Sequence, residues 1–373
     1  MSRVNKKIIV LPGDGIGPEV TAAATRLLAD CASAFDYRFD LQEMPFGGNA
    51  IDRCGEPLPS ETLEACRHAD AILLGAVGGP KWDSQPIGKR AESGLLALRG
   101  GLELYVNYRP IRVRESLVGI SPVRAEKVRG CNFEIIRELA GDIYFGAHEH
   151  YAENGRESAR DLAQYSEDEI ERIARYAFER AAARRRRLVS VDKANVLATS
   201  VLWRKTVTRV ANDYPGVTLE HMYVDNAAMQ IVLNPARFDV IVTSNLFGDI
   251  LSDEAAALAG SIGLIPSMSR GRSPIGALYE PIHGSAPSLA GRDIASPLGS
   301  IFCVSLMLRE SFGLHSEAEW IESAVDRVLE QGYRTADIAE PGTEPVGCSK
   351  IVELIRAEMS DSLVHAERYG WGV

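Results

Sequence analysis

Short apolar runs alternate with amphipathic segments along most of the chain. Runs rich in Val, Ile and Leu, as in strands buried on both faces, occupy residues 6–14, 71–80, 188–196 and 239–247. Segments with apolar residues three or four positions apart, which predict helices, occupy residues 18–35, 60–71 and 167–187. This alternation predicts an α/β fold with an open, mostly parallel sheet covered by helices.

Four further segments have the β-branched and aromatic residues of strands. They are residues 37–47, 101–113, 133–146 and 219–229. The sequence contains neither an internal repeat nor a low-complexity linker. A length of 373 residues predicts two domains or one large α/β domain.

The composition is that of an ordinary globular protein, with 46% hydrophobic and 25% charged residues. A net charge of −10 argues against attraction to nucleic acid or to an anionic membrane. The basic run 184–187 is predicted to be the solvated end of the helix 167–187. Because no apolar run approaches membrane length and the first residues lack a signal-peptide core, we expect a cytoplasmic protein. The six cysteines lack zinc-type spacing, so we expect reduced, packed thiols.

The glycine-rich turn LPGDGIGPEV, residues 11–20, invites comparison with a Rossmann motif but does not match it. The dinucleotide fingerprint requires G-x-G-x-x-G, whereas the glycines here are 13, 15 and 17 and Pro18 follows. A strand-to-helix turn followed by Pro near the first helical position explains the pattern by turn and cap chemistry. We therefore predict no Rossmann motif.

An apolar segment, NLFGDILSDE at residues 245–254, carries two acidic residues one helical turn apart. In a helix, Asp249 and Asp253 share a face at roughly 5 to 6 Å. Two unit charges at that distance repel by roughly 3 kcal/mol at an effective dielectric near 20, and a divalent cation would reverse the sign. The apolar flanks argue against a fully solvated face, so we predict a metal site.

Basic residues beside apolar runs suggest the rest of a site. Arg99, Arg109 and Arg137 fit an anion site, because guanidinium forks match carboxylates bidentately. The substrate would then carry more than one carboxylate. Lys193 and Asp225 each end a strand-like run, and a Lys near a divalent metal can act as a base. The polar region 145–166 is either a surface loop or an arm that reaches a partner subunit.

Eleven short motifs between about residues 7 and 315 share the order and spacing of one known family. They are LPGDGIGPEV, GGPKWD, ESGLLALR, NYRP, RELAGDIYFG, VDKANVL, WRKTV, VDNAAM, NLFGDILSDEAA, GSIGLIPS and EPIHGSAP. Together they resemble the 3-isopropylmalate dehydrogenases of the isocitrate/isopropylmalate dehydrogenase family. The resemblance implies oxidative decarboxylation of (2R,3S)-3-isopropylmalate to 4-methyl-2-oxopentanoate with NAD⁺, in leucine biosynthesis.

The resemblance also implies roles for individual residues. Arg99, Arg109 and Arg137 resemble the clamp for the substrate carboxylates, and Asp249 and Asp253, with Asp225 of a second subunit, resemble the Mg²⁺ or Mn²⁺ ligands. Asp225 also borders the substrate. Lys193, again from the second subunit, resembles the base that takes the C2 hydroxyl proton, and Tyr144 resembles the acid that protonates the enolate carbon.

The family fold implies two domains without a Rossmann motif and a homodimer with shared active sites. Residues 1–104 and 259–373 would form a discontinuous cofactor-side domain, and residues 105–258 a substrate and dimerisation domain with an arm near 145–166. The expected NAD contacts are Gly79, Pro80, Lys81, Trp82, His283, Gly284, Ser285, Ala286, Pro287, Ser288 and Ser296.

Four positions depart from the family pattern. Ser288 replaces the usual Asp, Ser296 the usual Asn, and Ala140 and Asp142 the usual Thr and Gly. A Lys-Tyr pair typical of NADP-using relatives is absent from this loop.

The remaining question is the substrate. Glu92, Leu95 and Leu96 occupy the segment that faces the variable group of the substrate, and two leucines suit an alkyl chain. The alternatives are a paralogue acting on another 3-substituted malate, D-malate or tartrate, and a catalytically silent regulatory subunit.

Overall fold

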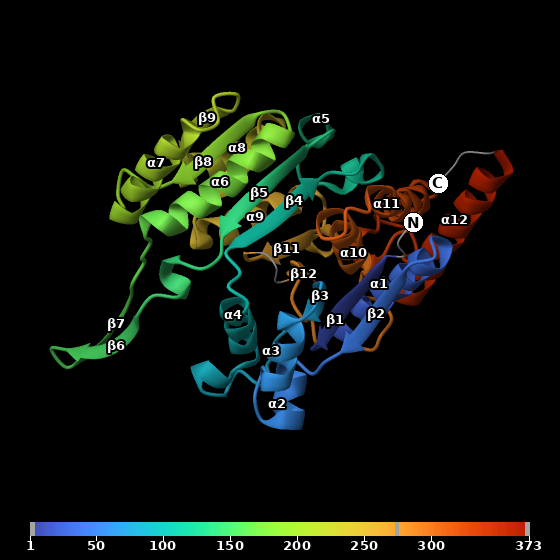
Figure 1. Ribbon diagram of the computed structural model, residues 1–373, viewed down its shortest axis with the longest axis horizontal. Coiled ribbons are helices and arrows are strands. Elements are labelled where there is room, and N and C mark those ends of the chain that lie inside the picture. The colour runs from blue at the N-terminus through green and yellow to red at the C-terminus, as the bar shows by residue number, and fades with distance from the viewer. Residues whose placement is uncertain (1–3, 273–275, 370–373) are drawn as a thin grey trace. The chain divides into compact units, whose positions relative to one another are not determined.

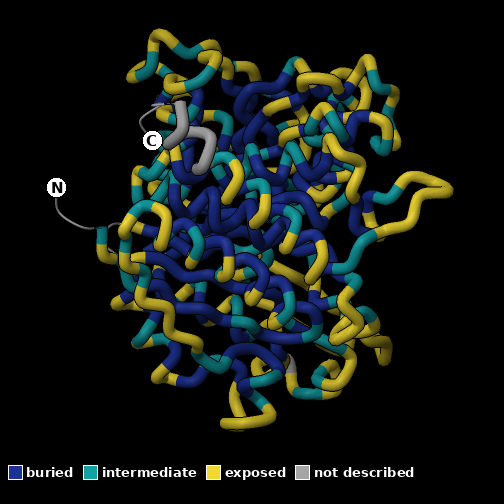
Figure 2. The backbone as a smooth tube through the Cα atoms, turned by 90° about the vertical axis from the view of Figure 1, so that its right-hand side faces the viewer, coloured by how far each residue is buried: buried dark blue, intermediate teal, exposed yellow. Residues whose placement is uncertain are grey.

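The computed structural model describes residues 4–272 and 276–369, and the chain divides into two compact units. The first unit comprises Met1–Glu103, Arg114–Ser121 and Ala259–Val373, and the second comprises Leu104–Val113 and Pro122–Leu258. The first unit is therefore built from both parts of the chain that flank the second. Figure 1 shows the elements of each unit, and Figure 2 shows buried strands and helices with exposed connections around them.

The first unit contains five strands in the order β2-β1-β3-β12-β11. Their bounds are β1 Asn5–Gly13, β2 Arg38–Glu43, β3 Ala71–Ala76, β11 Pro266–Arg270 and β12 Ala277–Pro281. All neighbours run parallel except β11 and β12. Strand β3 is buried along its whole length, as expected for a strand with both faces covered.

The helices of the first unit cover this strand set. They are α1 Gly17–Ala34, α2 Gly48–Cys54, α3 Ser60–Arg67, α4 Ala91–Gly101, α10 Leu298–Glu310, α11 His315–Glu330 and α12 Cys348–Tyr369. Short 3-10 turns occupy Ile87–Lys89, Glu115–Ile120, Ile262–Leu264 and Ala336–Ile338. Helix α10 is buried from Leu298 to Leu308 and packs on β11 and β12, so it forms the centre of the core of this unit.

The second unit contains five strands in the order β4-β5-β10-β8-β9. Their bounds are β4 Val106–Arg112, β5 Asn132–Glu138, β8 Arg187–Asp192, β9 Thr218–Tyr223 and β10 Val240–Thr243. Only the β4–β5 pair is antiparallel among these neighbours. The predicted α/β fold with a mostly parallel sheet is confirmed.

Its helices are α5 Ala125–Val128, α6 Glu167–Ala183, α7 Ala198–Ala211, α8 Val224–Leu233 and α9 Asn245–Leu258, with 3-10 turns η3 Asp142–Tyr144 and η4 Pro235–Arg237. Helix α6 begins with a capping box in which Ser166 and Glu169 satisfy each other's backbone N–H groups. The register aligns the carboxyl ends of the parallel strands, since Thr243 of β10 pairs with Arg137 of β5 and Val191 of β8. Side chains just beyond these residues therefore gather at one edge of the sheet.

The polar region 145–166 contains a β-hairpin, which we call the arm. Strand β6 His148–Glu153 pairs with β7 Arg156–Asp161 in a separate two-stranded sheet. Nearly every residue of both strands is exposed, and the ribbon extends away from the other elements of its unit (Figure 1). The connecting Asn154 and Gly155 both have left-handed φ, as a two-residue hairpin turn requires.

Two expectations from the sequence are wrong in detail. The run 184–187 lies just after α6, which stops at Ala183; Arg185, Arg186 and Arg187 are exposed as predicted, but the Arg184 guanidinium is partly buried and pairs with Glu134 and Asp239. All six cysteines are free and five are buried, but Cys54 is exposed. Among the described residues, no helix has the length and hydropathy needed to cross a bilayer.

Candidate functional site

Helix α9 presents Asp249 and Asp253 on one face, as predicted for residues four apart. The helix follows β10 directly, so strand order places it at the carboxyl edge of the sheet. Its apolar residues Leu251, Ala255 and Leu258 are buried. Its other face is more open than the flanking sequence suggested, because the Asp253 side chain is 63% exposed and Ile250 is 59% exposed.

Two buried guanidinium groups contact these aspartates. Arg109 on β4 is 7% exposed; its Nη1 donates to Asp253 Oδ1 at 3.0 Å and its Nη2 to Asp249 Oδ1 at 3.4 Å. Arg137 on β5 is 2% exposed and its Nη1 donates to the same Asp249 oxygen. The structure thus brings Arg109 and Arg137 of the predicted clamp together with two of the three predicted metal ligands, Asp249 and Asp253.

Neighbouring polar side chains hold both arginines in place. Arg109 donates through Nε to Asn107 Oδ1 at 2.8 Å and through Nη1 to Ser252 Oγ at 2.6 Å. Arg137 Nε donates to Asn245 Oδ1 at 2.8 Å. Guanidinium groups with several fixed acceptors are preorganised for bidentate contact with carboxylates.

Tyr144 closes the same cluster from η3. Its hydroxyl donates to Asp249 Oδ2 at 2.5 Å, and the Arg137 guanidinium lies over its ring with 5.3 Å between Cζ and the centroid. Burial, followed by the hydrogen bond to Asp249, raises the pKa of Tyr144. Burial also raises the pKa of Asp253, against the opposing effect of Arg109. Tyr144 is therefore protonated near neutral pH and can donate a proton.

Lys193 and Asp225 form an ion pair in the second unit. Lys193 follows β8 and Asp225 lies in the first turn of α8, and Lys193 Nζ donates to Asp225 Oδ1. This hydrogen bond lowers the pKa of Asp225. Among the described residues, the donor atoms of Asp225, Asp249 and Asp253 do not come within 4.8 Å of one another as a group in one chain.

In the first unit, Arg99 near the end of α4 pairs with Glu280 of β12. Its Nη2 donates to Glu280 Oε1 at 2.9 Å, while its buried Nε has no hydrogen-bond partner among the described residues. On the same helix, Glu92 and Leu96 are exposed and Leu95 is partly buried. These three predicted specificity residues thus present at least part of their surface to ligand or solvent.

The predicted nicotinamide-side segment, Gly79 to Trp82, follows β3. Trp82 packs on Gly48, where a Cβ would lie 2.4 Å from the indole ring, and its Nε1 donates to Asp52 Oδ1 at 3.2 Å. Lys81 Nζ pairs with Asp52 Oδ2 at 2.6 Å, and Pro80 is exposed. Gly79 has a φ of 157°, which favours glycine.

The loop 283–296 packs against the glycine-rich turn at the start of α1. Ile16 N donates to Ser285 O at 2.8 Å, and a Cβ on Gly15 would lie 1.9 Å from that oxygen. Close approach of this loop therefore requires Gly15. Loop packing explains this glycine without a Rossmann motif. Ala286 packs on the apolar cluster that contains Ile16 and Val20.

Two polar atoms of this loop are buried without hydrogen-bond partners among the described residues, namely His283 Nε2 and Ser296 Oγ. Burial lowers the pKa of His283, so its ring is neutral. Gly284, Pro287 and Ser288 are exposed. Orphaned buried polar atoms beside exposed loop residues fit the binding of a polar ligand such as an adenosine group.

Sequence reasoning missed several residues that build the site. Asn107, Ser252 and Asn245 fix the two arginines, and Tyr165 accepts a hydrogen bond from Asn245 N at 2.9 Å. Asn245 carried a usable signal, because a polar residue between a buried strand and an apolar helix often satisfies groups at the helix start. Tyr165 carried none, since it lies at the edge of a weakly patterned polar region.

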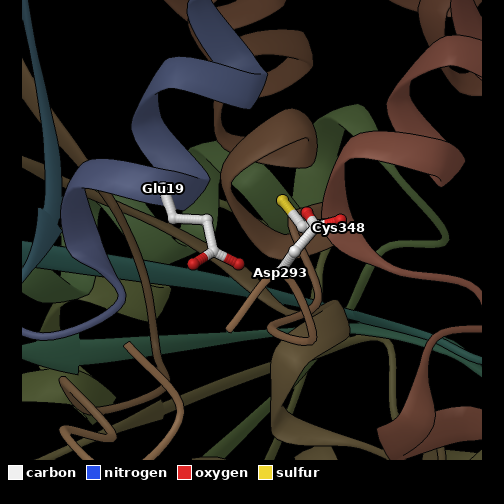
Figure 3. A group of neighbouring side chains, drawn as sticks. All are labelled: Glu19, Asp293 and Cys348. Carbon is white, nitrogen blue, oxygen red and sulfur yellow. The ribbon is translucent and has the colours of Figure 1, made fainter. Parts of the chain in front are cut away.

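One further group of potential ligands lies in the first unit. Glu19 at the start of α1, Asp293 of the loop 283–296 and Cys348 at the start of α12 offer donor atoms within 4.8 Å of one another (Figure 3). Burial raises the pKa of the Cys348 thiol to about 12, and the neighbouring carboxylates add to the shift. Asp293 Oδ1 already accepts from Ser349 N at 2.7 Å, so contacts at the start of α12 account for this carboxylate and we assign the group no role.

The chain is similar to known proteins over most of its length. The sequence profile of the family described as isocitrate/isopropylmalate dehydrogenase matches residues 7–355. A protein named 3-isopropylmalate dehydrogenase from Bacillus licheniformis is 51% identical over 96% of this chain and 97% of its own length. One of the same name from Nitratidesulfovibrio vulgaris is 53% identical over 94% of this chain and 99% of its own.

Solved structures give the same picture. Isocitrate dehydrogenase from Methylococcus capsulatus has a TM-score of 0.84 and 34% identity, covering 95% of this chain and 99% of that one. A beta-decarboxylating dehydrogenase from Thermococcus kodakarensis has a TM-score of 0.79 and 36% identity, covering 97% and 98%.

Proposed function

Because the chain belongs to the isocitrate/isopropylmalate dehydrogenase family, we propose that it oxidatively decarboxylates (2R,3S)-3-isopropylmalate to 4-methyl-2-oxopentanoate with NAD⁺ and Mg²⁺ or Mn²⁺. The observation that carries the proposal is the cluster on α9, where two buried arginines, two aspartates and one tyrosine meet. This donor set suits an anionic substrate bound beside a hard cation. The reaction belongs to leucine biosynthesis, and we expect it in the cytoplasm.

The ion pairs on α9 explain how substrate and metal fit the same cluster. In this structure Asp249 and Asp253 form ion pairs with Arg109 and Arg137. A dicarboxylate substrate can replace the aspartates as partner of the guanidinium groups. The carboxylates of Asp249 and Asp253 are then free to bind a divalent cation. Each buried charge then keeps an opposite partner, which is the condition for leaving it buried at low cost.

Proton movements fall to two residues of this chain. Lys193, once neutral, takes the C2 hydroxyl proton, and Asp225 holds its ammonium form afterwards through their ion pair. When bound, NAD⁺ would accept the hydride from C2, and a metal held by Asp249 and Asp253 would supply positive charge to the oxygen that becomes negative when CO₂ leaves C3. Tyr144, protonated near neutral pH, then delivers a proton to the enolate carbon.

We place the NAD⁺ site in the first unit because two of its segments have groups that suit NAD⁺. The loop 283–296 offers His283 Nε2 and Ser296 Oγ, and the segment Gly79–Trp82 is held by Asp52. A carboxylate that could bind the ribose hydroxyls is missing at Ser288, so we expect weaker NAD⁺ binding than an Asp at that position would give.

The homodimer with shared sites rests on an apolar surface of α8 and α9. Met229, Val232 and Leu233 of α8 and Ile250 of α9 are exposed, and the two helices pack together. Exposed apolar side chains gathered on two neighbouring helices support an interaction surface there. A second copy of the chain bound there by a two-fold axis would bring its own α8, and therefore Asp225, to the α9 that carries Asp249.

A steady-state panel tests the substrate and the cofactor together. We expect 3-isopropylmalate with NAD⁺ to give the highest kcat/KM among 3-isopropylmalate, D-malate, isocitrate and 3-benzylmalate with either NAD⁺ or NADP⁺. Leu95 and Leu96 support an alkyl group at C3. A higher kcat/KM for another malate would instead establish a paralogue, and no turnover of any would establish a silent subunit.

A further inference from the structure

The arm joins the rest of its unit through residues 142–147 and 162–165, which we call its outgoing and returning roots. Both roots contact the first two backbone amides of α9. Tyr165, at the end of the returning root, accepts from Asn245 N at 2.9 Å. Asp142, at the start of the outgoing root, accepts from Leu246 N through Oδ2 at 3.1 Å. These amides would otherwise be without partners, because the first N–H groups of a helix have no acceptor within it. Helix α9 is thus capped from outside by residues that flank the arm.

The two roots are also joined to each other. Asp142 N donates to Gln164 O at 3.2 Å, and Leu162 N donates to Ala147 O at 3.0 Å. The backbones approach so closely that a Cβ on Gly146 would lie 1.8 Å from Leu162 O. The roots and the start of α9 therefore form one hydrogen-bonded block.

Burial makes this block stiff. Tyr165 is buried with its ring edge-on to Trp203, 5.6 Å between centroids, and its hydroxyl also engages the fully buried Glu138. Asp142 is buried and keeps a left-handed φ of 71°, a conformation that Asp tolerates better than most residues. Its Oδ1 accepts from Ile143 N at 2.9 Å, which fixes the turn that carries Tyr144.

From this geometry we propose that Tyr165 and Asp142 are positioning residues for the metal-binding face of α9. Asp249 lies one helical turn after the capped amides, so any displacement of the helix start moves its carboxylate. Metal sites tolerate errors of only about 0.5 Å in ligand position. The inference rests on the proposed function, because it takes Asp249 and Asp253 as metal ligands.

The test is direct Mn²⁺ binding to the full-length protein with 3-isopropylmalate present and NAD⁺ omitted, with free Mn²⁺ measured by electron paramagnetic resonance against a protein-free blank of the same composition. Tyr165→Phe keeps the ring and removes the acceptor, and we expect its Kd for Mn²⁺ to rise about tenfold. Tyr108→Phe is the matched control, because it removes a buried hydroxyl that donates to Glu134 at 2.9 Å in the same unit. The control should bind Mn²⁺ like the wild type even where its unfolding temperature falls.

A second pair of variants keeps the inference testable if Tyr165→Phe does not fold. Asp142→Ala removes both accepted hydrogen bonds and should raise the Kd about tenfold, whereas Asp142→Asn tolerates the left-handed φ and keeps one acceptor oxygen that can face Leu246 N, so it should raise the Kd less. Equal Mn²⁺ affinity in Asp142→Ala and Asp142→Asn, or in Tyr165→Phe and Tyr108→Phe, would overturn the inference. Two other results would instead overturn the proposed metal site. One is that the wild type does not bind Mn²⁺, and the other is that Asp249→Asn binds Mn²⁺ as tightly as the wild type.

Discussion

Asp249 is the residue on which most of the site converges. It accepts from Arg109, Arg137 and Tyr144, so its carboxylate links the anion clamp, the proton donor and the predicted metal position. We expect Asp249→Asn to lower kcat by on the order of 10²-fold or more at ordinary Mg²⁺, because a ligand charge is lost where negative charge develops. Steady-state kinetics over a Mg²⁺ titration measure this. A wild-type enzyme that keeps its full rate in excess EDTA would contradict the metal-dependent account.

Ser288 offers the opposite kind of experiment, a gain of binding. It is exposed in the loop 283–296, so a longer side chain can be placed there without displacing buried groups. Ser288→Asp should tighten NAD⁺ binding by on the order of 1 to 3 kcal/mol, the value of a hydrogen bond to a charged group. The KM for NAD⁺ and the Kd from nucleotide fluorescence report the change. If both stay at their wild-type values, adenosine does not bind at this loop.

At the scale of elements, His221 couples strand β9 to helix α7. Its Nε2 lies 2.9 Å from Thr208 Oγ1, and burial lowers its pKa below the ordinary value of 6.5. The unfolded chain therefore binds more protons than the folded one as pH falls below this value, so acidification removes stability there. Denaturant unfolding of wild type and His221→Gln across pH 7.5 to about 5 measures it. The wild type should lose more unfolding free energy than the variant, and parallel curves would refute the assignment.

Some helices and strands can be predicted from their sequence pattern, and others cannot. Strands such as β3 and β10 are continuous apolar runs, and α9 has a clear amphipathic pattern, so all were predictable. For the arm the sequence predicts only a surface loop or an arm, because exposed strands lack alternation between buried and exposed faces. Its Asn154-Gly155 turn was the available signal for a hairpin.

At the scale of the whole molecule, the site depends on contacts between distant parts of the sequence. Arg109 and Asp253 are 144 residues apart, and Tyr165 reaches Asn245 over 80 residues. The residue types of the arginines and aspartates predicted an anion site and a metal site, and the family motifs implied the role of each residue. Tyr165 and Ser252 could not be found this way, because hydroxyl side chains that position other residues have no characteristic spacing in sequence.

The central claim is an active site completed by a second copy of the chain, with Lys193 and Asp225 from one subunit and Asp249 and Asp253 from the other. Lys193→Met and Asp253→Asn homodimers should each be nearly inactive, because every site lacks one essential group. After dissociation, equal mixing and reassociation, half of the dimers are mixed and each has one intact site of two.

Activity of the mixture measures the claim directly. We expect recovery to about a quarter of wild-type activity, since random pairing gives one intact site in four. Native mass spectrometry confirms that subunits have exchanged. Activity that stays at the level of the separate variants, despite confirmed exchange, would contradict the account and place the base and the metal ligand in the same chain's site.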